Sequence, residues 1–230
     1  LTFSPDSHVL AIETRPNSIE LWDIVRNREI EPPIVSPTDG IYSLAFSPDG
    51  QILVWGSGNN NVNFYSLRTH EIDSVSLLDK LGPGRITDIH FSRDGTTIIL
   101  VSTYSSATVL ALNTDDYQIA IDPFVTSQKW ILETAISPDG SSLAVGGCNN
   151  ITAEGACTQA EIGLWDISTG QLIDKPLIGH QDGVSDLDFS PDGTILASVS
   201  WDGTVILWDV SGFDTTDDGR PLGKTLAGHE

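Results

Sequence analysis

The stretch that decides the fold is Gly179–Val210, which reads GHQDGVSDLDFSPDGTILASVSWDGTVILWDV. The letters SPDG at 190–193 are typical of a tight turn, because proline presets φ and glycine tolerates a left-handed backbone. Two short runs rich in β-branched and apolar residues follow, Thr194–Ser200 and Val205–Val210, with a turn of sequence WDG between them. These features predict a meander of antiparallel strands.

The same turn recurs through the chain at a nearly constant period. FSPDG or a close variant begins at Phe3, Phe46, Phe91, Ile136 and Phe189. Successive copies are 43, 45, 45 and 53 residues apart, and a period of this size indicates a repeat architecture. The strands are apolar at nearly every position, so we expect both faces of each small sheet to pack on neighbouring sheets, as in a radial stack.

The last repeat resembles a WD40 repeat. The resemblance depends on Gly179-His180 before the first strand, Ser198 in the second strand, Asp202 in the turn and Trp208-Asp209 at the end of the third strand. In that family the four polar side chains form a hydrogen-bonded tetrad that holds one blade together. The resemblance therefore implies a structural tetrad of His180, Ser198, Asp202 and Trp208.

Serine, histidine and aspartate are also the members of a nucleophilic catalytic triad. Such a triad needs an exposed serine beside an oxyanion hole, whereas the propeller interpretation places Ser198 inside a sheet with its hydroxyl engaged. We therefore interpret these residues as buried polar groups that satisfy one another.

The other four repeats keep only parts of the pattern. The closing dipeptide stands at Trp22-Asp23 and Trp165-Asp166, and it is replaced at residues 65–66 and 112–113. In the second repeat Trp55 stands where Ser198 is expected and Asn59 where Asp202 is expected, so no family tetrad can form there. We interpret Trp55 as a core residue, and the alternative is an aromatic side chain that reaches the channel.

The sequence therefore predicts an all-β fold, a β-propeller of four-stranded antiparallel blades with five repeats present, as a single domain over residues 1–230. The expected blades are residues 1–37, 38–82, 83–126, 127–179 and 180–230. Five blades could close into a ring or form an open arc of a larger propeller. We expect a fragment of a larger ring, because the chain opens on an inner strand and stops after an outer one. The repeat rhythm resembles prokaryotic multi-repeat proteins, in which such arrays often follow a signalling or ATPase domain.

The charge limits the classes of partner. The net charge is −21, from 32 acidic and 11 basic residues. Phosphate backbones and anionic membrane surfaces would be repelled, so we expect neither nucleic-acid nor membrane binding. The charge is consistent with a basic protein partner, or with a surface that merely keeps the protein soluble or suits a salty habitat.

The main irregularity is an insertion in the fourth repeat. Residues 146–160, between the second and third strands, form a segment about ten residues longer than in the last repeat, and long loops on rigid β scaffolds often carry function. The resemblance implies that this connection lies on the top face, together with the equivalent connections of other repeats, which contain Tyr104 and Trp201. The connections that precede each inner strand lie on the same face, and Trp130 belongs to one of them. Exposed aromatic residues at this face would form a protein-binding patch, unless they fold down onto a blade.

Cys148 and Cys157 are the only cysteines, and both lie in the insertion. We include them in the candidate partner-binding set. A disulfide would fix the loop and imply an oxidising, extracytoplasmic compartment, whereas two reduced thiols would suit a cytoplasmic protein, which is the assignment we favour. We expect no metal, because structural zinc needs about four ligands. The acidic loop with Asp214, Asp217 and Asp218 lacks the EF-hand spacing.

These observations predict a non-catalytic protein-interaction scaffold without a cofactor, which could be the sensor or regulatory module of a larger protein. The sequence contains no HExxH, GxSxG or phosphate-binding glycine loop. The alternative is a propeller enzyme or small-ligand binder that uses the central channel. Its inner-strand candidates are Asp88, His90, Asp186 and Asp188.

Overall fold

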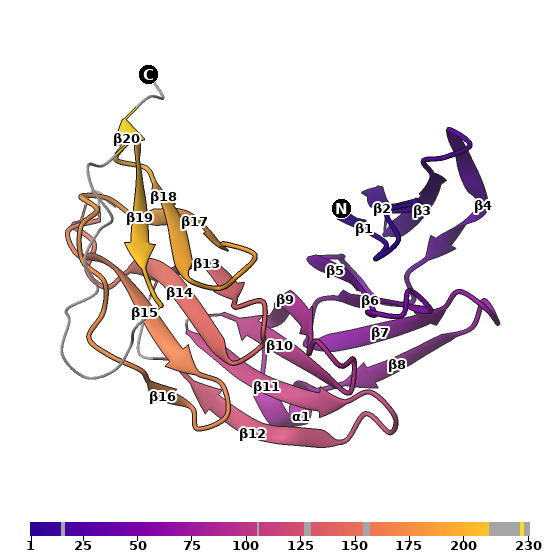
Figure 1. The fold of residues 1–230 in the computed structure, drawn as a ribbon. Coiled ribbons are helices and arrows are strands. Elements are labelled where there is room, and N and C mark those ends of the chain that lie inside the picture. The colour runs from indigo at the N-terminus through magenta and orange to yellow at the C-terminus, as the bar shows by residue number, and fades with distance from the viewer. Residues whose placement is uncertain (15–16, 105, 127–129, 154–156, 212–225, 228–230) are drawn as a thin grey trace. The chain divides into compact units, whose positions relative to one another are not determined.

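A computed structural model describes residues 1–14, 17–104, 106–126, 130–153, 157–211 and 226–227. The chain divides into two compact units. Unit 1 contains residues 1–104 and 108–123, and unit 2 contains residues 105–107 and 124–230. The strands of both units are labelled in Figure 1.

Unit 1 is built from three four-stranded antiparallel sheets, each a meander in chain order. Blade 1 contains β1 (Thr2–Phe3), β2 (Val9–Thr14), β3 (Ser18–Asp23) and β4 (Arg28–Val35). Blade 2 contains β5 (Ser43–Phe46), β6 (Ile52–Gly56), β7 (Asn61–Ser66) and β8 (Ile72–Ser76). Blade 3 contains β9 (Arg85–Phe91), β10 (Thr97–Thr103), β11 (Ala107–Asn113) and β12 (Ile119–Val125), of which a few residues belong to unit 2.

Unit 2 adds two sheets of the same kind. Blade 4 contains β13 (Trp130–Ile136), β14 (Ser142–Cys148), β15 (Ala160–Asp166) and β16 (Gln171–Leu172). Blade 5 contains β17 (Val184–Phe189), β18 (Ile195–Ser200), β19 (Thr204–Asp209) and β20 (Leu226–Ala227). The described residues thus form five four-stranded meanders, which confirms the predicted all-β fold of antiparallel blades.

One element was not predicted. The single-turn helix α1 (Leu78–Leu81) lies between β8 and β9, and it is too short to show a helical period in the sequence. Within the described part of the chain, no helix has the length and apolar character that crossing a bilayer requires.

The same turn connects the first and second strands of each blade, which explains the recurring letters SPDG. In blade 5 the Ser190 hydroxyl donates to Asp192 Oδ1 at 2.6 Å, and the same carboxylate oxygen accepts the Thr194 N–H at 3.1 Å. The Ser190 hydroxyl in turn accepts the Ile195 N–H at 2.9 Å. The serine hydroxyl and the backbone N–H bonds lower the pKa of Asp192 to about 2, so this carboxylate is ionised at neutral pH.

The turns also stack within each unit. A Cβ on Gly50 would lie 3.6 Å from Cδ of Pro5, in the turn of the preceding blade. The same relation holds for Gly95 with Pro48 in unit 1 and for Gly193 with Pro138 in unit 2, at 3.5 and 3.6 Å. Each of these glycines thus lies near the proline of the preceding turn, with room for no more than a small side chain between them.

The core of each unit lies between sheets. In unit 1 the inner strand β5 contacts both β1 and β9, and in unit 2 β13 contacts β17. Trp55 in unit 1 and Trp208 in unit 2 are the largest fully buried side chains among the described residues. The prediction that Trp55 is a core residue is confirmed.

Candidate functional site

The four side chains of the last repeat meet inside blade 5. His180 Nε2 and Ser198 Oγ are 2.7 Å apart, and Trp208 Nε1–H donates to the same hydroxyl oxygen at 2.8 Å. On the other side of the imidazole, Nδ1 lies 3.2 Å from Asp202 Oδ2. Ser198 links strand β18 to the buried indole of β19, and Asp202 ties the β18–β19 turn to the segment before β17.

The electrostatics of this group favour a neutral histidine. Burial lowers the pKa of His180, and Asp202 opposes this shift only in part. Burial alone would raise the pKa of Asp202, but hydrogen bonds from Thr204 and from the Gln181 N–H outweigh it and lower the pKa. We therefore assign Nδ1–H as the donor to the carboxylate and Nε2 as the acceptor for the Ser198 hydroxyl.

This geometry argues against catalysis by Ser198. The side chain of Ser198 is fully buried, and its hydroxyl already interacts with His180 and Trp208. A nucleophilic serine must reach a substrate carbonyl beside an oxyanion hole. The arrangement is that of a structural hydrogen-bond network.

Thr204 is a fifth participant that the sequence analysis missed. Its hydroxyl donates to Asp202 Oδ1 and lies 3.0 Å from His180 Nδ1. A signal was available, because the tripeptide Asp-Gly-Thr also occurs at 94–96 and 192–194. In both places the threonine hydroxyl donates to the aspartate at 2.8 Å.

Blade 2 has a different buried network in place of the tetrad. The side-chain amide of Asn63 donates to Thr38 Oγ1 at 3.0 Å and to Ser57 Oγ at 3.1 Å. Its carbonyl oxygen accepts the Ser74 hydroxyl at 2.7 Å. Asn63 therefore connects the segment before β5 with β7 and β8, and none of these four side chains titrates.

Trp55 and Asn60 extend the polar contacts of unit 1. Trp55 Nε1–H donates to Ser36 Oγ at 2.9 Å. The amide of Asn60 donates to the Gly82 carbonyl at 2.8 Å, and its side-chain oxygen accepts the Ser102 hydroxyl at 2.6 Å. The turn residues Asn59 and Asn60 both have positive φ, 55° and 52°.

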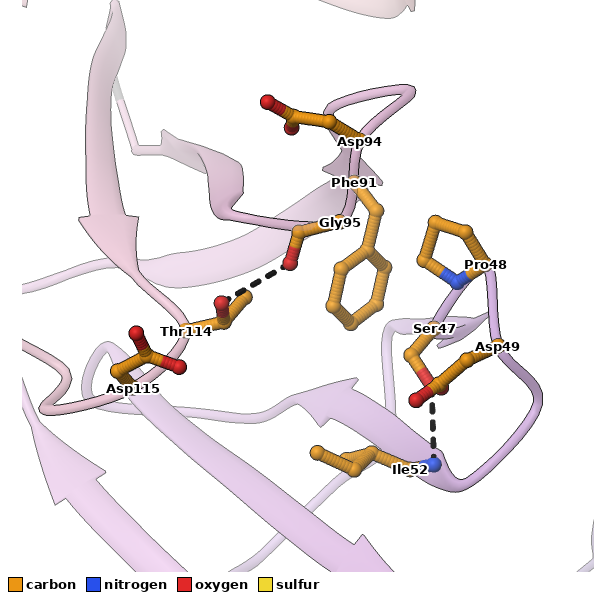
Figure 2. Close-up of a pocket in the computed structure, with 9 residues that line it drawn as sticks. All are labelled: Ser47, Pro48, Asp49, Ile52, Phe91, Asp94, Gly95, Thr114 and Asp115. Carbon is orange, nitrogen blue, oxygen red and sulfur yellow. Dashed lines mark hydrogen bonds between the residues drawn. The ribbon is translucent and has the colours of Figure 1, made fainter.

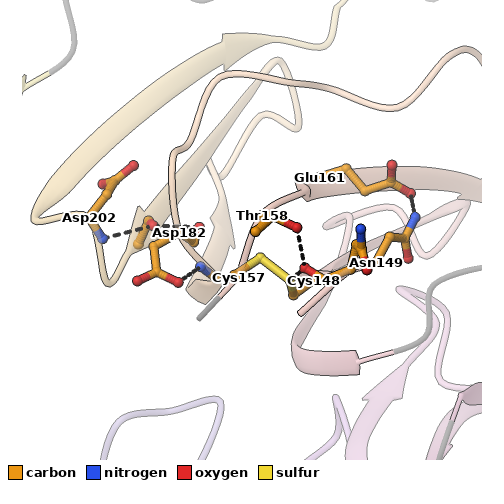
Figure 3. The surroundings of a disulfide bond; sticks show 10 residues. Cys148, Asn149, Cys157, Thr158, Glu161, Asp182 and Asp202 are labelled. Carbon is orange, nitrogen blue, oxygen red and sulfur yellow. Dashed lines mark hydrogen bonds between the residues drawn. A yellow bond between two sulfur atoms is a disulfide. The ribbon is translucent and has the colours of Figure 1, made fainter. Parts of the chain in front are cut away.

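The insertion of blade 4 continues the β14–β15 hairpin (Figure 3). Beyond the paired ends of the two strands, the Asn149 N–H donates to the Gln159 carbonyl at 2.9 Å, and Thr158 N–H donates to the Asn150 carbonyl at 2.8 Å. Cys148 and Cys157 form a disulfide across this extension. Asp182 and Asp202 of blade 5 lie in the surroundings of the bond.

The disulfide corrects two expectations. The interpretation of Cys148 and Cys157 as free thiols, which supported the cytoplasmic assignment, is wrong for this structure. The two side chains are also only 3% and 8% exposed and belong to the same apolar cluster as Val184 and Leu187. Because both side chains are buried, they offer little surface to a partner.

Two of the three candidate aromatic residues are exposed. Tyr104, after β10 in unit 1, is 81% exposed, and Trp201, between β18 and β19 in unit 2, is 64% exposed. Trp130 is the first residue of β13, and its side chain lies outside the described residues.

The turn that carries Trp201 is firmly held. The Trp201 N–H donates to the Gly183 carbonyl at 3.1 Å, and the Ser200 hydroxyl donates to the Asp182 carbonyl at 2.8 Å. The Asp202 N–H donates to Ser200 Oγ at 3.1 Å. Together with the tetrad, these bonds fix the backbone on which the exposed indole stands.

Unit 1 contains an open pocket of about 470 Å³ between two successive SPDG turns (Figure 2). Its lining combines apolar Pro48, Ile52 and Phe91 with three aspartates, one of which is Asp115. The other two, Asp49 and Asp94, already accept hydrogen bonds within their own turns. We interpret the pocket as a groove left by the stacking of the turns.

The residues proposed for a channel site lie on two strands. Asp88 and His90 belong to β9 of unit 1, and the exposed Asp186 and Asp188 belong to β17 of unit 2. Among the described residues, no group of three or more His, Cys, Asp or Glu side chains could hold a metal ion. Asp214, Asp217 and Asp218 lie outside the described residues, and the channel alternative stays a prediction.

Two segments of the chain match the family WD domain, G-beta repeat, at residues 33–66 and 170–209. The chain is 29% identical over 171 residues to a periodic tryptophan protein 2 homolog from Dictyostelium discoideum, covering 73% of this chain and 17% of that protein. It is 31% identical over 150 residues to a guanine nucleotide-binding protein subunit beta from Schizosaccharomyces pombe, covering 65% and 42%. A DDB1- and CUL4-associated factor 11 homolog from Caenorhabditis briggsae is 24% identical over 237 residues, covering 90% and 43%. The chain thus spans less than half the length of each of these relatives.

The two matched segments have the same relation to the sheets. Residues 33–66 begin in β4 of blade 1 and end in β7 of blade 2, and residues 170–209 run from β16 of blade 4 through β19 of blade 5. The sequence repeat is therefore offset from the sheet by one strand. It comprises the outer strand of one blade and the three inner strands of the next.

Proposed function

We propose that this chain is a non-catalytic protein-interaction scaffold that binds a protein partner through the connections between the second and third strands of its blades. The observation that carries the proposal is Trp201, a large aromatic side chain that is 64% exposed on a turn held by backbone and side-chain hydrogen bonds. Rigid, exposed aromatic side chains are typical anchors of protein interfaces. Tyr104 is the corresponding candidate of unit 1.

The relatives support this class of function. One relative is named as a subunit of a guanine nucleotide-binding protein, and another as a factor associated with DDB1 and CUL4. Both names describe proteins that act in association with other proteins, and a shared repeat raises the expectation of a similar role here. In the finer form of the proposal, the chain is the sensor or regulatory module of a larger signalling or ATPase protein.

We also propose that the protein works in an oxidising compartment. The disulfide between Cys148 and Cys157 supports this proposal, because such bonds persist mainly outside reducing cytosol. Mass spectrometry of natively purified protein, alkylated without prior reduction, tests it. Two alkylated cysteines would contradict the proposal, and no added mass before reduction would support it.

The interaction itself is tested by affinity capture from an extract of the source organism, followed by quantification of each captured protein. We expect Trp201→Ala to weaken binding of the specific partner by about 2 kcal/mol or more, which is roughly a 30-fold increase in Kd. Phe3→Ala is the matched control, because Phe3 is also an exposed aromatic residue but lies on the inner strand β1. Equal capture by the wild type and Trp201→Ala would contradict the proposed surface.

A further inference from the structure

The same pair of positions meets at one blade junction in each unit. Counting back from the first residue of the FSPDG-type turn, the fourth residue is Tyr42 in blade 2 and Leu132 in blade 4. The sixth residue is Arg85 in blade 3 and Gly183 in blade 5. The junction of blades 2 and 3 in unit 1 can therefore be compared directly with the junction of blades 4 and 5 in unit 2.

In unit 1 the junction contains its own cation. The guanidinium carbon of Arg85 lies 5.2 Å from the centroid of the Tyr42 ring. This distance is within the range in which the negative face of an aromatic ring attracts a cation. The ring of Tyr42, which is 46% exposed, is thus partly covered by a side chain of the same chain.

In unit 2 glycine takes the place of the arginine. A Cβ on Gly183 would lie 2.7 Å from Leu132 Cδ1 and 3.2 Å from Trp201 Cε3, so both side chains lie directly against the glycine. Leu132 lies at a β-bulge, where the register between β13 and β14 shifts, and a bulge changes the direction of a side chain. The result is an apolar surface made of Leu132, 37% exposed, and Trp201, 64% exposed.

Carboxylates accompany the segments that form this surface. Asp182 Oδ1 accepts the Gly183 N–H at 2.7 Å, so this carboxylate lies beside the glycine that Leu132 and Trp201 adjoin. Glu133 directly follows Leu132 on β13, and Asp186 lies three residues after Gly183 on β17. Burial raises the pKa of Glu133, and the negative charge of Asp186 raises it further. At the equivalent positions unit 1 has Ser43, Gly84 and Asp88, which is one carboxylate instead of three.

We propose that this surface, formed by Trp201 and Leu132 and bordered by Glu133, Asp182 and Asp186, receives an arginine side chain of the protein partner. At the unit 2 junction the partner's guanidinium stacks on the aromatic ring, as Arg85 does at the unit 1 junction. Arginine fits better than lysine, because its planar group stacks on an indole and offers paired N–H donors to carboxylates. The inference rests on the proposed function, since it names the chemistry of the partner at the same surface.

The test uses two short peptides that differ in charge alone. Acetyl-Gly-Gly-Arg-Gly-Gly-amide and its citrulline counterpart are titrated into the ¹⁵N-labelled full chain, and the indole N–H signal of Trp201 is followed after assignment with Trp201→Phe. We expect the arginine peptide to shift this signal saturably and to bind about tenfold more tightly than the citrulline peptide, whose side chain has a similar shape without the charge. Equal binding of the two peptides, or no shift with either, would overturn the inference.

A variant with a matched control locates the charge effect. Glu133→Gln combined with Asp186→Asn is expected to weaken the arginine peptide by about fivefold, because two carboxylates are lost from the border. Asp188→Asn removes one charge from the same strand at an exposed position and should leave the affinity unchanged. Equal weakening by Asp188→Asn would show general attraction to an acidic protein and would contradict a defined site.

The two proposals fail in different ways. If Trp201→Ala loses the partner while arginine and citrulline peptides bind alike, only the arginine inference is wrong. If the Trp201→Ala protein keeps its partner, the proposed interaction surface is wrong, whatever the peptide titration shows.

Discussion

Blade 2 in unit 1 and blade 5 in unit 2 each contain a buried hydrogen-bond network, and the two networks are built from different side chains. Each must join the segment before its inner strand to its second and third strands through buried polar groups. Blade 5 uses an imidazole and a carboxylate around Ser198, whereas blade 2 uses the amide of Asn63 between hydroxyl groups. What the fold requires is that the buried donors and acceptors be satisfied, and more than one set of residues can do so.

The position of Ser198 in blade 5 is taken by a residue of very different size in blade 2. Its counterpart in blade 2 is Trp55, which fills the space with a ring and donates from Nε1 to Ser36. In blade 5 the indole comes instead from Trp208 on β19 and donates to Ser198. In both blades a buried indole N–H finds a hydroxyl oxygen, although the indole comes from a different strand.

The largest effect is expected from Ser198→Ala, which removes the hydroxyl shared by His180 and Trp208. Two buried groups would then lose a partner, and each orphaned group costs about 1–3 kcal/mol, so we expect a loss of roughly 2–6 kcal/mol in the free energy of unfolding. Urea titration followed by tryptophan fluorescence measures the loss. Ser185→Ala in β17, whose hydroxyl lies 3.4 Å from its acceptor, is the control and should change stability by less than about 0.5 kcal/mol.

Asn63→Ala is the corresponding change in blade 2. It leaves hydroxyl groups of Thr38, Ser57 and Ser74 with fewer partners, but hydroxyl groups can rotate towards other acceptors, so we expect a smaller loss of about 1–3 kcal/mol. Because Asn63 and Ser198 belong to different units, the double variant should show the sum of the two losses within about 0.5 kcal/mol. A deviation of more than that amount would show that the two networks depend on each other.

The pH dependence should separate the two blades. The pKa of His180 is lowered by burial, so the unfolded chain binds a proton more readily than the folded one. Its contribution to stability is therefore complete above the unfolded pKa of about 6.5 and is lost as the pH falls through the lower, folded pKa. Thermal melts between pH 8 and pH 4 should show this decline in the wild type but not in His180→Gln, whatever the absolute stability of the variant. A decline of equal size in both proteins would assign it to other groups.

The smallest expected effect concerns the turn between the first and second strands of each blade. The SPDG turn of blade 1 has Ser7 at φ 60°, where the turn of blade 5 has Gly193 at φ 72°. A side chain in this left-handed region costs about 1 kcal/mol relative to glycine, so Ser7→Gly should raise the free energy of unfolding by up to that amount. Gly193→Ser is the reciprocal control and should lower it. Chemical denaturation of both variants checks the sign, and a stabilising Gly193→Ser would refute the explanation.

The regular parts of the fold could be predicted because they are local. The SPDG turns, the strands between them and the meander order follow from short sequence patterns that recur five times. The tetrad geometry follows from the family resemblance of one repeat. Thr204 was missed although the tripeptide Asp-Gly-Thr recurs, because the sequence alone does not show that the threonine hydroxyl donates to the aspartate.

The remaining contacts depend on register and on distant segments. Ser102 contacts Asn60 across 42 residues, and Trp55 contacts Ser36 across 19, so these partners lie too far apart in the sequence for a local pattern to indicate the contact. The same holds for Arg85 and Tyr42. The open alternatives for the cysteines could be settled only by the folded hairpin, in which Cys148 pairs with Ala160, Cys157 pairs with Ile151, and the two cysteines form a disulfide.

The five turns between first and second strands share one set of serine and aspartate hydrogen bonds. A recombination event that joined any two of these turns would preserve the order of strands in the repeat. The residues whose hydrogen bonds close the turn would be present in the joined segment. Gain or loss of a whole repeat is thus the large sequence change that disturbs folding least. Selection on a binding surface can then act on copies that already fold.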